Sequence, residues 1–317
     1  MRARRTIPVT LILTTLNEEA GIPLFFQGVR ASTVLPADIV ICDGGSTDAT
    51  VEAIRHEAGM LPVTLVIEAG ANIARGRNAA VARATQDILA ITDAGCRIEP
   101  LWLELLTEPL LNDVSIDAVG GGYALEGETW VQRCTEAATL PLEAQDPENF
   151  LPSSRSFAVR RDAFLRAGGY PEELTFAGED TALCLRMRAL GMRFVTRWDA
   201  VVHWETRRTL KSFLWQYYLY GLGDGEARSL GWRYRRIALK WGAMLLLLLC
   251  SPLLPWLLVP AALGVAAYAA HLYRVFRWKR LSPLRAAGGF LFVLLKEAAM
   301  FAGYIAGRVF SPKRLRT

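Results

Sequence analysis

Cysteine is scarce in this chain, and its spacing excludes the common metal and redox motifs. There is no Cys-x-x-Cys pair and no ligand spacing of the kind that zinc modules use. Isolated cysteines usually pack as small apolar side chains and stay reduced, which favours a cytosolic location for the folded part of the chain. The five are Cys42, Cys96, Cys134, Cys184 and Cys250.

A glycine-rich dinucleotide loop is also missing. A nicotinamide-dependent oxidoreductase carries Gly-x-Gly-x-x-Gly at the turn after its first strand. Here that turn, residues 14–19, has no glycine and places Glu18 and Glu19 where a pyrophosphate would bind. The triple glycine at 120–122 comes much later, so the sequence argues against a Rossmann dehydrogenase.

Long apolar runs are absent from the first three quarters of the chain and are confined to the part after about Ile237. The apolar run near the amino terminus, residues 9–13, is too short for a signal peptide. The net charge is +5, and the excess basic residues flank the C-terminal apolar runs. This placement favours an anionic membrane surface over a nucleic acid as the partner.

The first three quarters show the alternation of strands and helices that is typical of an α/β protein. Short apolar runs at 9–13, 37–42, 63–67 and 88–91 predict strands, and a helix is expected to begin near Ala20. We expect a loop at 70–78 and an alanine-rich helix at 79–84. The spacing predicts a largely parallel, doubly wound sheet.

Carboxylates follow three of these apolar runs. They are Glu18, Asp43 and Asp93, and the carboxyl ends of strands in such a sheet meet at one edge. Small residues, Ala94 and Gly95, follow Asp93 and leave room for a ligand. We therefore predict that Asp93 is the point where a metal and a diphosphate meet; the alternative is a capped strand end with a solvated carboxylate.

Five polar motifs follow one another along the chain. They are Thr15-Leu16-Asn17-Glu18-Glu19, Asp43-Gly44-Gly45-Ser46-Thr47-Asp48, Arg77-Asn78, Thr92-Asp93-Ala94-Gly95 and Phe176-Ala177-Gly178-Glu179-Asp180. In this order and spacing they resemble the nucleotide-sugar-binding half of family 2 glycosyltransferases with the GT-A fold. The resemblance covers roughly residues 7–225.

The resemblance implies a role for each matched residue. It places Asp43 at the nucleobase, Glu18 near the nucleoside, Asp93 at the ribose and the divalent metal, Arg77 and Asn78 at the nucleotide pocket, and Asp180 as the catalytic base.

Glu179 and Asp180 stand just before a helical run at 181–190. The positive end of a helix keeps a nearby carboxylate ionised, as a base that takes a proton from the acceptor hydroxyl must be. We therefore take both as catalytic candidates; the alternative is that they are only N-terminal helix acids.

Two features depart from the family pattern. The family commonly has a second acid at the metal position, where this chain has Gly95, so the cation would be held by Asp93, the diphosphate and waters. We expect Mg²⁺ or Mn²⁺, and Mg²⁺ tolerates water ligands well. His203 follows an apolar run and is a second candidate ligand, or else a hydrogen-bonded core residue.

Arginines border the region where the family binds its acceptor. Arg155, Arg160 and Arg161 could meet an acceptor phosphate or simply be surface arginines. The Gln-x-x-Arg-Trp motif of the family's processive synthases is absent at 216–220, which favours the addition of a single sugar.

The C-terminal part predicts helices in or on a membrane. A basic, aromatic amphipathic helix starts near Arg207 and is expected to end flexibly at 220–225. Two short helices turning at 251–255 fit residues 241–273, and a third apolar run at 290–310 carries Lys296 and Glu297 as a charge pair. We place the boundary of the membrane helices at 230/231; the alternative is a helical hairpin buried in a soluble protein.

These observations together predict a GT-A-type α/β fold with a doubly wound mixed sheet, followed by C-terminal hydrophobic helices. The predicted function is inverting transfer of one sugar from a UDP- or GDP-sugar to a membrane-borne glycolipid, polyprenyl-linked or polysaccharide acceptor, at the cell inner membrane with a cytoplasmic catalytic domain. Two alternatives remain: a nucleotide-sugar-binding scaffold, favoured by Gly95, and a transporter subunit with a soluble lobe.

Overall fold

The computed structural model describes residues 4–139, 146–148, 150–278 and 281–310. The chain divides into two compact units, the first comprising residues 1–126 and 141–205, the second 127–140 and 206–317. The second unit thus includes the amphipathic helix that follows residue 206, whereas the sequence places the boundary near residue 230.

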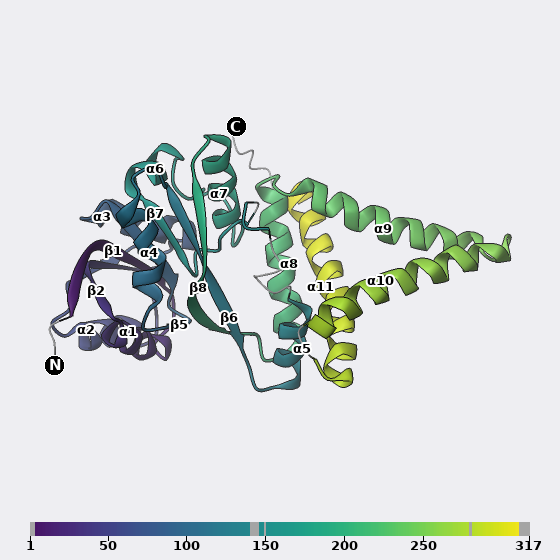
Figure 1. Ribbon diagram of the computed structural model, residues 1–317, viewed down its shortest axis with the longest axis horizontal. Coiled ribbons are helices and arrows are strands. Elements are labelled where there is room, and N and C mark those ends of the chain that lie inside the picture. Colours follow the sequence, from purple (N-terminus) through teal and green to yellow (C-terminus); the bar gives the residue numbers. More distant parts are fainter. Residues whose placement is uncertain (1–3, 140–145, 149, 279–280, 311–317) are drawn as a thin grey trace. The chain divides into compact units, whose positions relative to one another are not determined.

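The first unit is built on an eight-stranded sheet with strand order β3-β2-β1-β4-β7-β6-β8-β5 (Figure 1). The neighbours β3, β2, β1 and β4 are parallel, whereas β7 runs antiparallel to both β4 and β6. The strands are β1 (Arg5–Thr15), β2 (Val34–Asp43), β3 (Val63–Ile67), β4 (Ile88–Asp93), β5 (Cys96–Ile98), β6 (Ala118–Glu126), β7 (Phe157–Arg160) and β8 (Phe194–Glu205).

Helices cover both faces of this sheet. In β1, Leu11 and Leu13 pack into one apolar core and Ile12 into the other, because successive side chains point to opposite faces. The first core is shared with α1 (Gly21–Ala31), α2 (Thr50–Ala58) and α4 (Trp102–Asn112), the second with α3 (Ile73–Arg83), α6 (Arg161–Arg166) and α7 (Glu179–Ala189). Burial on both faces explains the apolar runs and confirms the doubly wound mixed sheet.

The helix α3 begins earlier than its sequence indicates. The loop expected at 70–78 ends at Asn72, whose side-chain oxygen accepts a hydrogen bond from the Arg75 amide and caps the helix. Gly76 obscures the helical pattern, but a Cβ there would lie 3.2 Å from the Thr14 side chain, so a small residue suits the contact with β1. As a consequence Arg77 and Asn78 project from a helix and not from a loop.

The second unit is helical. The turn between α9 and α10 lies at 251–254, which confirms the two helices expected there. Two of its helical stretches, Pro255–Phe276 and Pro283–Phe310, are long and apolar enough to cross a membrane. The elements are α5 (Trp130–Ala138), α8 (Leu210–Glu226), α9 (Gly231–Cys250), the short 3₁₀ helix η2 (Pro255–Leu257), α10 (Leu258–Trp278) and α11 (Pro283–Phe310).

The flexible end expected at 220–225 is wrong, because α8 continues through these glycines to Glu226. A Cβ on Gly221 would collide with the main chain of α11 at Met300, and one on Gly303 would collide with the main chain of α8 at Tyr218. The glycines of α8 therefore serve a close helix crossing and not a hinge.

Lys296 and Glu297, which the sequence suggested as a charge pair, each bind groups on other helices. The Glu297 carboxylate accepts hydrogen bonds from Lys240 and Trp241 of α9 and from the Tyr268 hydroxyl of α10. The Lys296 ammonium donates to the carbonyl of Ala138, 2.6 Å away, at the C-terminal end of α5. Adjacent positions on a helix point in different directions, so each charge finds a partner on a different element.

Candidate active site

The sheet brings two of the predicted carboxylates to the same edge. Asp43 ends β2 beside Thr15, and Asp93 ends β4 beside Thr14, so the two acids flank the carboxyl end of β1. Neighbouring strands are about 4.8 Å apart, which puts these strand ends roughly 10 Å from each other.

Asp43 is completely buried and fully hydrogen-bonded. Its Oδ1 accepts from the amides of Gly45 and Ser46, and its Oδ2 accepts from the hydroxyls of Thr15 and Ser46. Burial alone would raise the pKa of Asp43, but these hydrogen bonds, those from Ser46 foremost, lower it below its usual value. The carboxylate thus orders the loop after β2.

The loop after β1 is tied to the loop after β2. Asn17 adopts a left-handed conformation with φ of 55°, and its amide donates to the Ser46 hydroxyl. The Glu18 amide donates to Thr50 at the start of α2. A Cβ built on Gly21 would lie 3.1 Å from a carboxylate oxygen of Glu18 and 3.0 Å from the carbonyl of Ala94, the residue after Asp93. Glu18 therefore lies at the edge that Asp43 and Asp93 share.

Arg77 joins two distant parts of the chain in the centre of the site. Its Nη2 donates to Oδ1 of Asp93 and its Nη1 donates to Oε1 of Glu179, and both donor–acceptor distances are 2.6 Å. The Arg77 side chain is 2% exposed, so this is a buried carboxylate–guanidinium–carboxylate bridge. It connects α3, the end of β4 and the first turn of α7.

The bridge sets the ionisation of its members. Burial would raise the pKa of Asp93, but Arg77 and then Arg155 lower it below its usual value. Burial and then the neighbouring Asp180 raise the pKa of Glu179, against the opposing charge of Arg77. Asp93 is therefore held as an anion, whereas Glu179 resists ionisation more strongly.

The two acids at the start of α7 differ in their surroundings. Glu179 is buried and bound to Arg77, whereas Asp180 is partly exposed and accepts a hydrogen bond from the Thr181 amide, 2.7 Å away. Both occupy the first turn of α7, where the helix dipole favours negative charge. Of the pair, Asp180 is the one that a substrate hydroxyl can approach.

Asn78, the neighbour of Arg77, holds a loop in place. Its amide nitrogen donates to the carbonyl of Tyr170 and to Glu172, and its oxygen accepts from the Tyr170 amide. Both the nitrogen and the oxygen of the Asn78 side chain bind this segment. Its role at the nucleotide pocket stays a prediction, because a nucleotide would have to share or replace these hydrogen bonds.

Sequence reasoning missed Tyr170. The Tyr170 ring lies against Arg77, with 5.2 Å between the guanidinium carbon and the ring centroid, and its hydroxyl is 2.7 Å from the Ser154 hydroxyl. Nothing in the sequence links Tyr170 to Arg77, because the contact exists only once α3 and the segment before α7 are packed together.

The three candidate arginines separate in the structure, and Arg161 is the first residue of α6. Arg155 stacks on Trp204 at 4.1 Å, and its Nε lies 3.8 Å from Oδ2 of Asp93, so it faces the site. Arg160 donates to the carbonyls of Leu110 and Ile116 and secures the end of α4. Trp204 thus joins the site as a platform that the sequence did not single out.

His203 lies between two carboxylates. Its Nε2 is 2.6 Å from Glu99 and its Nδ1 is 2.7 Å from Glu126. Each nitrogen that could bind a metal therefore already faces a carboxylate oxygen, and coordination would require Glu99 or Glu126 to move. Its role as a ligand stays a prediction.

A cation that arrives with the substrate fits the site better than a resident one. Within the described residues there is no group of three or more His, Cys, Asp or Glu side chains that could hold a metal. Oδ2 of Asp93 is the oxygen not taken by Arg77, and a Cβ on Gly95 would meet nothing within 4 Å. A single carboxylate oxygen that Arg77 does not bind suits Mg²⁺ or Mn²⁺ that takes its other ligands from a diphosphate and water.

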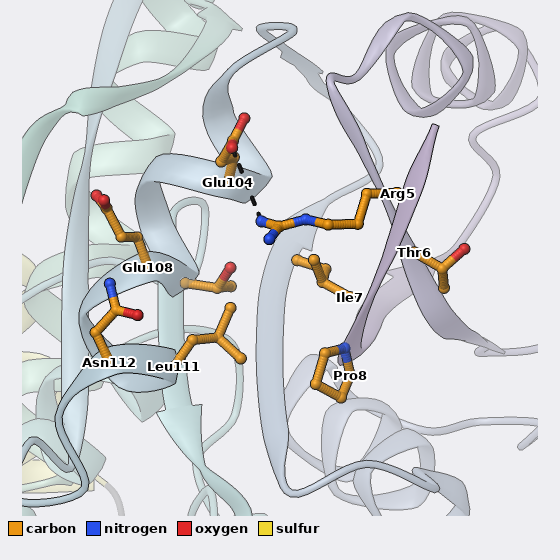
Figure 2. A pocket seen from close by; sticks show the side chains of 9 residues that line it. Arg5, Thr6, Ile7, Pro8, Glu104, Glu108, Leu111 and Asn112 are labelled. Atoms are coloured by element: carbon orange, nitrogen blue, oxygen red, sulfur yellow. Dashed lines mark ion pairs between the residues drawn. The ribbon is translucent and has the colours of Figure 1, made fainter. Parts of the chain in front are cut away.

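A pocket of about 410 Å³ lies elsewhere in the first unit, between the start of β1 and α4 (Figure 2). Arg5 and Glu104 face each other across it at 4.0 Å. Because it adjoins the amino end of β1, it is at the opposite end of that strand from Asp43 and Asp93, and it has no part in the candidate site.

Comparison with known proteins decides the family. Residues 10–167 match the family described as Glycosyl transferase family 2. The chain carries a family 2 glycosyltransferase domain. The match covers β2, α3 and β4, which carry Asp43, Arg77 and Asp93.

The relatives of this glycosyltransferase support the same placement. It is 29% identical over 231 residues, 68% of each chain, to the succinoglycan biosynthesis protein ExoA of Rhizobium meliloti (strain 1021). Among solved structures it resembles the mannosyltransferase PcManGT from Pyrobaculum calidifontis, solved in complex with GDP-Man and Mn²⁺. The TM-score is 0.60 and the identity 19%, with 98% of this chain and 89% of that chain covered. The likeness shows the GT-A-type mixed sheet followed by C-terminal helices.

Proposed function

We propose that this glycosyltransferase is attached to a membrane and transfers a single sugar, with inversion, from a UDP- or GDP-sugar to a membrane-borne acceptor. The acceptor would be a glycolipid, a polyprenyl-linked sugar or a polysaccharide. The observation that carries the proposal is the difference between the two acids at the start of α7: Glu179 is buried and bound to Arg77, whereas Asp180 is partly exposed.

The chemistry follows from that difference. Asp180 would take the proton of the acceptor hydroxyl, whose oxygen then attacks the anomeric carbon of the donor. The bond between that carbon and the diphosphate oxygen breaks on the opposite face, which inverts the configuration. The bridge of Arg77 to Asp93 and Glu179 would keep the acid that follows β4 and the first turn of α7 in fixed register during this step.

The donor would bind along the carboxyl edge of the sheet. Asp43 and Glu18 would line the nucleoside side of the site, and Asp93 would hold Mg²⁺ or Mn²⁺ together with the diphosphate. When bound, the cation neutralises charge on the leaving diphosphate. The presence of Mn²⁺ and GDP-Man in PcManGT supports both the cofactor and the donor class.

The membrane-borne acceptor is supported by the second unit. Two of its helical stretches are long and apolar enough to cross a membrane, and the relative ExoA is a succinoglycan biosynthesis protein. An acceptor anchored in lipid would be concentrated where these helices hold the enzyme. The buried free cysteines of the first unit agree with a reducing compartment, so we place it on the cytoplasmic side of the cell inner membrane.

Donor turnover by the full chain in detergent, with UDP-, GDP- and dTDP-sugars and Mn²⁺, tests the proposal. Asp180→Asn should lower kcat by about 10²–10⁴-fold and leave the KM for the donor nearly unchanged. Asp162→Asn, which removes a first-turn acid from α6, is the matched control and should change neither. Activity of Asp180→Asn within a few-fold of the parent would refute Asp180 as the base.

Gly95 separates the enzyme from a scaffold that only binds the donor. Because a Cβ at Gly95 meets open space, Gly95→Asp should fold normally and supply a second oxygen ligand. We expect it to lower the Mn²⁺ concentration needed for half-maximal turnover and to tighten Mn²⁺ binding measured by electron paramagnetic resonance. Tight donor binding by the parent chain, with no turnover at any Mn²⁺ concentration, would favour the scaffold.

A further inference from the structure

The hairpin of α9 and α10 exposes a continuous apolar surface. The sequence between Lys240 and Arg274 contains no Asp, Glu, Lys or Arg. Figure 1 shows the two helices running out together from α8 and α11 and joining at their far ends, and a Cβ on Gly264 of α10 would lie 3.2 Å from Met244 of α9. Soluble proteins rarely leave such a patch in water. Its exposed members include Leu245, Leu246, Leu249, Leu253, Leu254, Trp256, Leu258 and Leu263.

The free part of the hairpin is too short to cross a bilayer. At about 1.5 Å per residue, the charge-free part of α9, from Trp241 to Cys250, is about 15 Å long. The hydrocarbon core of a bilayer is about 30 Å thick, so one leaflet is about 15 Å.

A polar cluster marks the base of the hairpin. Lys240 and Trp241 of α9 and Tyr268 of α10 all bind the Glu297 carboxylate of α11. Trp241 and Tyr268 are the residue types that gather at the level of lipid headgroups. The charged cluster therefore belongs at the membrane surface and not inside the hydrocarbon.

Beyond Tyr268, one face of α10 packs against α11. Leu272 and Phe276 are buried in a cluster with Phe292 and Val293 of α11. The stretch of α10 from its start at Leu258 to Tyr268 is about 15 Å long, which matches the free length of α9.

We propose that the hairpin from Trp241 to Tyr268 enters one leaflet only, turns near the bilayer centre at 251–254, and returns to the same side. Its partner is the acyl chains of that leaflet. Arg235 and Arg236, exposed on the preceding turn of α9, would meet anionic headgroups. This inference rests on the membrane attachment in the proposed function and not on the chemistry at Asp180.

Depth measurement on the full chain in sealed phosphatidylcholine–phosphatidylglycerol vesicles tests the proposal. A spin label is placed on Leu253→Cys, at the turn, in a Cys250→Ser background. The matched control is Leu239→Cys, on α9 just before the polar base; the native side chains at both positions are exposed. The other four cysteines are buried.

The expected result is a label at position 253 with the high oxygen accessibility of the bilayer centre and almost no contact with a water-soluble nickel chelate. The label at position 239 should show low oxygen accessibility and frequent contact with the nickel chelate. Contact of the 253 label with chelate enclosed on the far side would mean full crossing, and contact with chelate on the side of the catalytic unit would mean no insertion. Spin–spin broadening that persists on dilution with lipid would mean that a second copy covers the hairpin. Each of these three results overturns the proposal.

Donor turnover in the same vesicles keeps this test separate from the proposed chemistry. Loss of the depth signature with normal turnover refutes the one-leaflet hairpin alone. Absence of turnover with the expected depths refutes the glycosyl transfer mechanism alone.

Discussion

Arg77 is the residue that makes the candidate site a single structure. Its two ion pairs connect Asp93, at the end of β4, with Glu179, in α7, and burial removes the water that would otherwise screen them. A buried charge that loses its partner is costly, because the charge left behind cannot be hydrated.

Arg77→Met should therefore destabilise the first unit by about 3–5 kcal/mol, since the buried Glu179 and the half-buried Asp93 lose their partner. Arg75→Met, two residues away on the same helix, removes an exposed pair with Glu68 and should change stability little. Chemical unfolding followed by intrinsic fluorescence in detergent measures both. Equal effects of the two substitutions would contradict a special role for the bridge.

Asp43 links stability to pH. Its pKa is lowered in the folded state, so the ionised form stabilises the fold at pH values above the unfolded pKa of about 4. That contribution is lost as pH falls through the lower, folded pKa. We expect the thermal midpoint of Asp43→Asn to be lower than that of the parent at pH 7, and the difference to shrink at pH 3. A difference that is constant from pH 7 to pH 3 would argue against an ionised Asp43.

At the level of elements, the crossing of α8 and α11 is unusually close. Gly221 and Gly225 of α8 face Gly303 and Gly307 of α11, and a side chain at any of them would collide with the main chain of the other helix. Small residues spaced four apart on both helices allow this approach, in water or in lipid. The crossing secures α11, whose Glu297 in turn anchors the α9–α10 hairpin.

Gly303→Leu should destabilise the second unit by about 1–3 kcal/mol, because the added side chain has no room at the crossing. Gly242→Leu is the control, since a Cβ on Gly242, on α9, would meet nothing within 4 Å. Urea unfolding followed by helical circular dichroism compares them in the same detergent. If Gly303→Leu is as stable as Gly242→Leu, the close crossing does not exist in solution.

At the level of the whole molecule, charge and apolar surface are distributed unevenly between the two units. The first unit buries its apolar residues in two cores, whereas the second leaves leucines and tryptophans of α9 and α10 exposed next to arginines. This combination suits a surface that offers both negative charge and hydrocarbon, as the proposed membrane attachment requires.

Reversing charge beside the hairpin tests that distribution. The double substitution Arg235→Glu and Arg236→Glu should weaken binding of the full chain to anionic vesicles at least about tenfold, at roughly 1 kcal/mol per basic residue, and leave binding to neutral vesicles unchanged. Arg55→Glu with Arg83→Glu makes the same charge change on exposed residues of the first unit and should have little effect. Flotation in a sucrose gradient measures both pairs, and an equal loss would mean that only net charge matters.

The positions of the first four strands and the family were both readable in the sequence. Apolar runs of the right length predicted the parallel half of the sheet, since a strand buried on both faces leaves a pattern that needs no partner to be recognised. Asp43 and Asp93 could be placed at one edge for the same reason, because parallel strands present their carboxyl ends together. The turn at 251–254 was visible from its prolines.

Contacts between distant segments were decided only by tertiary structure. Arg77 and Glu179, Tyr170 and Asn78, and Lys240 and Glu297 each pair residues that lie far apart in the chain, and no local pattern records such a choice. The glycines of α8 read as flexible in isolation because a glycine loses its freedom only when another helix is packed against it. Local propensity and periodicity are properties of the chain, whereas partners, burial and the free length of a hairpin exist only after folding.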